Sequence, residues 1–81
     1  MRGQTVIVRA DGGIPLVRKI WQVDDQAVYI TDDATLAKLA QGQDGPSPIG
    51  FPREDVFKYE PEAAARIGRP EWSWSSLSRW G

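Results

Sequence analysis

The sequence contains no cysteine and no histidine among its 81 residues. A chain of this length forms at most one domain with a small core, and such domains are often reinforced by disulfides or a bound metal. Both reinforcements lose their commonest side chains when cysteine and histidine are missing. The stability of the domain must therefore come from side-chain packing or from association, and we expect no metal site and no cofactor.

The same absences limit catalysis, because an enzyme of this sequence would depend on carboxylates, lysine, tyrosine, serine or threonine. Adjacent acids occur at Asp24-Asp25, Asp32-Asp33 and Glu54-Asp55. Each pair falls where turns and helix starts favour acidic side chains. No calcium-binding Asp-x-Asp-x-Asp-Gly loop occurs, and no glycine-rich loop carries the lysine that cradles phosphate. We predict that the protein is not an enzyme; the alternative is a carboxylate site assembled from distant turns, such as Asp25 and Asp55.

No long apolar run is present, so the sequence predicts no membrane span. We expect no secretion, because no charged-then-apolar leader precedes Arg2–Val8. We expect a cytoplasmic protein, which suits the lack of cysteine. The net charge of −1 conceals a pattern of +3 over residues 1–23, −5 over 24–60 and +1 over 61–81. Either the basic and acidic segments lie side by side and compensate each other, or they form a polarised surface that steers a charged partner.

The first half of the chain has the patterns of three consecutive β-strands. Gln4–Ala10 is rich in β-branched residues and is followed by an Asp-Gly-Gly turn, which predicts a strand and a hairpin. Ile14–Val23 predicts the second strand, with a bulge or bend near Arg18 and Lys19, where two basic residues interrupt the alternation. Gln26–Thr31 alternates again and predicts the third strand of a meander.

The second half combines short helices with one more strand. Asp32–Ala40 begins with acids and contains good helix formers, which predicts a short helix. Gln43–Pro48 is predicted to be a loop because it is rich in proline and glycine. Apolar residues follow it at Ile49–Pro52. Proline before Arg53–Asp55 predicts a helical turn, and Val56–Tyr59 predicts a final short strand that pairs with the first.

This order resembles the topology of SH3-like barrels, in which a tight helical turn precedes the last strand. The fold class is therefore expected to be mainly β with short helices, as a small meandering barrel with one inserted helix. We assign residues 1–60 to the barrel. Residues 61–81 are expected to form a C-terminal helix, predicted over Glu60–Gly68, and a tryptophan-rich tail that packs on the barrel or on a partner.

Three of the four tryptophans, Trp72, Trp74 and Trp80, lie in the last ten residues. Burying them would recover roughly 15 kcal/mol at most, at about 25 cal/mol per Å². Ordering about ten residues costs a similar amount, on the order of 15 kcal/mol. Docking of the tail therefore depends on a well-fitting groove, which belongs to its own barrel, to a second copy or to another protein.

Tryptophan and arginine are the residue types that dominate protein interfaces. We predict an interaction module that binds a protein partner or itself, as a homodimer, through the tail residues Trp72, Trp74, Leu77, Arg79 and Trp80.

The alternative is a barrel that binds single-stranded nucleic acid, because aromatic rings stack on bases and basic side chains contact phosphates. The residues for that face would be Arg9, Arg18, Lys19 and Trp21. The net charge of −1 lacks the positive excess that a polyanion requires, so protein recognition is the preferred prediction.

Overall fold

The computed structural model describes residues 2–81, so Met1 of the predicted first domain lies outside the described residues. A five-stranded antiparallel sheet in the order β4-β3-β2-β1-β5 curls into a half-barrel. The strands are β1 (Thr5–Ala10), β2 (Ile14–Val23), β3 (Ala27–Thr31), β4 (Ile49–Pro52) and β5 (Val56–Lys58). The helical segments are α1 (Asp33–Ala40), α2 (Pro61–Ala64) and the 3₁₀ turns η1 (Asp11–Gly13), η2 (Arg53–Asp55) and η3 (Trp74–Ser76).

The mainly β fold with short helices is confirmed, and so is the pairing of the last strand with the first. β1 pairs with β2 over its full length and with β5 through Val6, Ile7 and Val8. Asp32 caps α1, where its Oδ1 accepts a hydrogen bond from the Thr35 N–H at 2.7 Å. The acids at the start of the predicted helix therefore mark its N-terminus correctly.

The bulge in β2 lies at Trp21, so its predicted position near Arg18 and Lys19 is wrong. The pairing with β3 shifts between Ile20 and Gln22, whereas Arg18 and Lys19 pair regularly with β1. The reason is core packing: Ile20 is buried and Val23 packs against the same cluster. Residues three apart on a regular strand face opposite sides, and one extra residue lets both side chains reach the core.

Several element boundaries differ from the sequence pattern. β4 is a strand paired with β3, although Ile49–Pro52 was expected only as an apolar return of the chain. Proline and glycine disfavour a strand by propensity, but an edge strand such as β4 tolerates both. The helix expected over Glu60–Gly68 is shortened to α2, with turns after it. The last strand ends at Lys58, one residue earlier than predicted.

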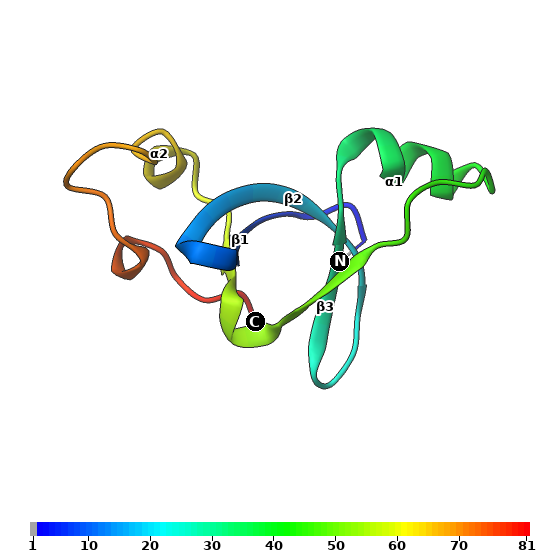
Figure 1. Cartoon of the computed structure of the whole chain (residues 1–81), viewed down its shortest axis with the longest axis horizontal. Helices are drawn as coiled ribbons and strands as arrows, with labels where there is room; N and C mark the ends of the chain where they lie inside the picture. The colour runs from blue at the N-terminus through cyan, green and yellow to red at the C-terminus, as the bar shows by residue number, and fades with distance from the viewer. Residues whose placement is uncertain (1) are drawn as a thin grey trace.

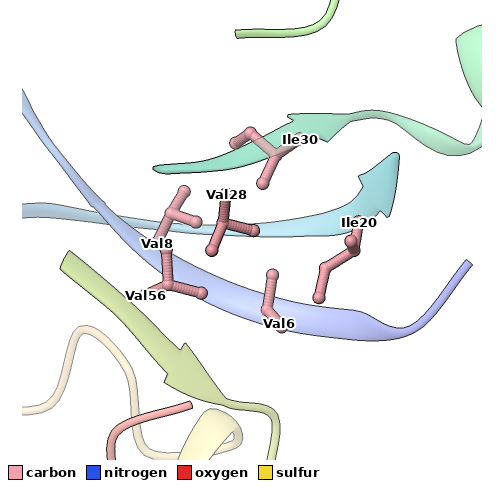
Figure 2. Packing of buried hydrophobic residues seen from close by; sticks show 6 residues of the cluster. All are labelled: Val6, Val8, Ile20, Val28, Ile30 and Val56. Carbon is pink, nitrogen blue, oxygen red and sulfur yellow. The ribbon is translucent and has the colours of Figure 1, made fainter. Parts of the chain in front are cut away.

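The main core lies on the concave face of the half-barrel. Figure 2 shows six side chains from four strands pointing toward one another, namely Val6, Val8, Ile20, Val28, Ile30 and Val56. Each of them is at most 4% exposed. They alternate along their strands, as expected for a sheet with one face turned to the core.

A second, smaller core lies on the opposite face of β1 and β5. Ile7 and Phe57 are buried there together with Leu77, which comes from the C-terminal tail. In Figure 1 the curled strands occupy the middle of the molecule, α1 and its loop stand at one end, and α2 with the tail stands at the other. The tail is therefore positioned over the sheet and away from α1.

Candidate functional site

The tail is held on the sheet by backbone hydrogen bonds along the outer edge of β5. The Lys58 N–H donates to the Ser78 carbonyl at 2.8 Å, and the Trp80 N–H donates to the Val56 carbonyl at 3.1 Å. An unpaired strand edge offers a row of such donors and acceptors. The last residues of the chain thus pair with β5 through one isolated bridge, Phe57 with Arg79, and cover this part of the edge.

The tail places its side chains on both faces of β5. Leu77 is 7% exposed and packs with Ile7 and Phe57 on the convex face. Trp80 is half-buried and packs against the core of the concave face. Arg79 forms an isolated bridge with Phe57 and its side chain is exposed. Leu77 is therefore the anchor of the tail, and Arg79 is free to contact solvent or another molecule.

Two tail tryptophans form an aromatic cluster over the second core. The Trp74 ring lies 4.9 Å from the Phe57 ring, centroid to centroid, and 5.0 Å from the Trp72 ring in an edge-to-face arrangement. Aromatic pairs prefer such tilted geometries. Both tryptophans are half-buried, and the buried Trp72 Nε1 has no hydrogen-bond partner among residues 2–81.

Arg9 borders this aromatic cluster. Its Nε and Nη2 donate to Asp55 Oδ1 at 2.9 and 2.7 Å. Its Cζ lies 5.4 Å from the Phe57 ring centroid and 5.5 Å from that of Trp74, within the range of a cation–π interaction. The charge of Arg9 is thus compensated by Asp55, and its side chain supports the cluster.

The basic residues predicted for a nucleic-acid face do not share one surface. Arg18 pairs with Val6, so it projects to the concave side, whereas Arg9 projects to the convex side together with Ile7. Lys19 projects to the convex side too, but it pairs four residues away along β1, about 13 Å from Arg9 at about 3.3 Å per residue. The Lys19 ammonium also donates to a neighbouring threonine hydroxyl. The sheet geometry therefore separates these three charges.

Trp21, the fourth residue of that predicted face, belongs to a separate groove. The groove has a volume of about 260 Å³ and is lined by Trp21, Gln22, Asp24, Tyr29 and Pro48. The Arg2 Cζ lies 4.0 Å from the Trp21 ring centroid, and Arg2 Nε donates to the Trp21 carbonyl at 2.9 Å. The sequence pattern missed this groove because the bulge that creates it depends on core packing.

The candidate catalytic acids either have structural partners or are exposed to solvent. Asp55 is paired with Arg9, and Asp25 is exposed in the turn between β2 and β3. Hydrogen bonds from the Gln26 and Ala27 N–H groups lower the pKa of Asp24. At the α1 cap, the bond from the Thr35 N–H lowers the pKa of Asp32. Both carboxylates are stabilised in their charged form by backbone donors.

Comparison of the chain with models of known protein families, with curated proteins and with solved structures found no match. Within residues 2–81, no helix has the length and apolar character needed to cross a membrane. In the same part of the chain, no group of three or more acidic side chains gathers as a potential metal site.

Proposed function

We propose that the protein is a non-enzymatic interaction module that binds a protein partner, or a second copy of itself, through the surface of its docked tail. This tail surface consists of Trp72, Trp74 and Arg79 on the convex side of β5 and of Trp80 on its other side, with Leu77 as the anchor. The observation that carries the proposal is that all three tail tryptophans are docked on the sheet, yet none of them is fully buried there.

Partly exposed tryptophans are suited to recognition when their positions are already fixed. The backbone bonds to β5 and the burial of Leu77 hold the tail in place, so a partner does not have to order it again. Such preorganisation leaves more of the contact energy for affinity. Arg79 is exposed in the same tail and supplies a polar contact of the type that interface hot spots favour.

The proposal includes an SH3-like assignment for the half-barrel over residues 1–60, with residues 61–81 as an appended helix and tail. Support comes from the strand order β4-β3-β2-β1-β5 and from the 3₁₀ turn Arg53–Asp55 between β4 and β5. That order and that turn are the features on which the topological resemblance rests.

Site-specific photo-crosslinking on the full chain tests the tail surface. A photo-reactive amino acid replaces the exposed Arg79 in one protein and, in a control, the exposed Gln43, which follows α1 in the sequence. We expect an adduct from position 79, with a second copy or with another protein of the source cell, that is absent from position 43. Equal or absent adducts at the two positions would refute the proposal.

Single-stranded nucleic-acid binding is the alternative function. It has less support, because Arg9 is paired with Asp55 and projects to the opposite face from Arg18. Tryptophan fluorescence titration with an oligonucleotide at two salt concentrations distinguishes the two functions. Binding that weakens steeply with salt would favour the alternative, and its absence would favour protein recognition.

A further inference from the structure

The Trp21 groove, defined above by Trp21, Gln22, Asp24, Tyr29 and Pro48, is built by the bulge in β2. Trp21 is the extra residue between Ile20 and Gln22, and Gln22 then pairs with Tyr29. A bulge re-aims the side chain of its extra residue, and natural sheets use this next to binding sites. Trp21 and Tyr29 are both half-buried and offer two aromatic walls to a single groove.

Gly50 fixes the position of the second aromatic wall. A Cβ atom on Gly50 would lie 3.0 Å from Tyr29 Cε1 and 3.3 Å from Tyr29 Cδ1. The ring of Tyr29 therefore lies against the bare backbone of β4, its pairing partner. A residue with a side chain at position 50 would push this ring out of place. The groove keeps its shape because glycine is present there.

The groove has the chemistry of a site for a positively charged side chain. The Trp21 ring also binds the guanidinium of Arg2, a residue that does not line the groove, with its Cζ 4.0 Å from the ring centroid. Tryptophan is the best aromatic acceptor for such a cation. The groove volume of about 260 Å³ is small for an organic ligand and suits the head of one long side chain.

A carboxylate lies at the rim of the same groove. Asp24 Oδ1 accepts hydrogen bonds from the Gln26 and Ala27 N–H groups at 2.9 and 2.8 Å, and these bonds lower the pKa of the carboxylate. Arg53 Nη1 donates to the backbone carbonyl of Asp24 at 3.0 Å, and within residues 2–81 the carboxylate has no ion-pair partner. Asp24 lines the groove, and its negative charge, which Arg53 offsets in part, disfavours phosphate there.

We propose that the Trp21 groove receives an arginine side chain of a protein partner, with its guanidinium between the Trp21 and Tyr29 rings and beside the Asp24 carboxylate. The inference rests on the proposed function as an interaction module and adds a second contact surface with a defined chemical preference. Arginine is favoured because its planar guanidinium stacks on aromatic rings and also donates to a carboxylate.

Peptide titration of the full chain tests this site. The probe is a capped pentapeptide in which two alanines precede a central arginine and two follow it. The control peptide carries the neutral, isosteric citrulline in place of arginine. We expect nitrogen–proton spectra to show shifts of the Trp21 indole and of the Gln22 and Tyr29 amides with the arginine peptide alone. The weak binding expected of a single side chain suits this method.

Two variants with a matched control give the test its specificity. Asp24→Asn retains an oxygen for the turn and is expected to weaken binding about threefold or more. Asp25→Asn removes the same charge from an exposed neighbour outside the groove lining, and it should change binding little. Trp21→Leu should weaken binding about fivefold, which is the cation–π contribution.

Equal shifts with citrulline, shifts centred elsewhere, or equal effects of the two aspartate variants would overturn the groove assignment. A failure here is distinguishable from a failure of the proposed function. If the peptide does not bind but the Arg79 position crosslinks, the groove is rejected and the tail surface stands. If the peptide binds without a tail crosslink, the groove stands and the tail surface is rejected.

Discussion

Replacing Leu77 with alanine tests whether the tail is part of the folded domain. Leu77 is 7% exposed and lies against Ile7 and Phe57 in the second core. It is the only buried side chain among residues 69–81. Leu77→Ala therefore removes the anchor of the tail and leaves a cavity over β1 and β5.

The expected cost is large for a domain of this size. Truncating a buried leucine to alanine costs about 2–5 kcal/mol in unfolding free energy. We expect about 3 kcal/mol here, because the surrounding tail can partly collapse into the space. A domain of 81 residues has a total stability of roughly 4–12 kcal/mol. The variant should thus lose a quarter or more of its stability, and its tail should detach before the sheet unfolds.

Urea denaturation followed by circular dichroism and by tryptophan fluorescence measures this cost. At a slope of about 1 kcal/mol per M, the midpoint should fall by about 3 M, and the melting temperature by more than about 10 °C. Ile49→Ala is the matched control, since Ile49 has the same number of carbons but is 63% exposed. Its effect should stay within about 0.5 kcal/mol. Equal midpoints for the two variants would refute the docking of the tail.

Three further predictions concern single polar or backbone features. Trp72→Phe removes an indole N–H that is buried without a partner, so the urea midpoint should stay the same or rise; a loss above about 2 kcal/mol would show that the N–H is satisfied. Gly50→Ala places a Cβ 3.0 Å from Tyr29 Cε1 and should shift the Tyr29 ring resonances, whereas an unchanged spectrum would contradict the close contact. The pKa values of Asp24 and Asp32 are lowered from the ordinary 3.8, so the unfolded chain binds protons first. Their contribution to stability is complete above that value and declines as pH falls below it; Asp32→Asn should flatten this decline in urea midpoints between pH 7 and 3, and an unaltered decline would refute the assignment.

Local patterns located most elements correctly, because these elements depend on short-range chemistry. β-branched runs bounded by glycine predicted β1 and β2. The acids at the start of α1 predicted that helix and include its cap, Asp32. β4 was missed because its proline and glycine oppose a strand by propensity, and only pairing with β3 makes it one. Propensity also overestimated α2, since isolated short helices need tertiary contacts to persist.

The candidate surfaces were predictable in part. Sequence composition singled out Trp72, Trp74 and Trp80, but near-balanced energies left open whether they dock on the chain itself. The structure places Trp72 and Trp74 over the convex face of β5 and Trp80 at its edge against the concave core, with Leu77 as anchor. The Trp21 groove was not predicted, because the sequence pattern indicated a bulge in this strand but placed it near Arg18 and Lys19 and not at Trp21.

The sequence by itself determined the class of the fold, the lack of disulfide and thiolate chemistry, and the concentration of aromatic side chains at the chain's end. These follow from residue types and their alternation, which act over a few residues. Only the tertiary structure decided that Leu77 is core, that Arg9 and Arg18 point to opposite faces, and that Trp21 and Tyr29 line one groove. Each of these depends on strand register, which is set by how distant residues fill one common core.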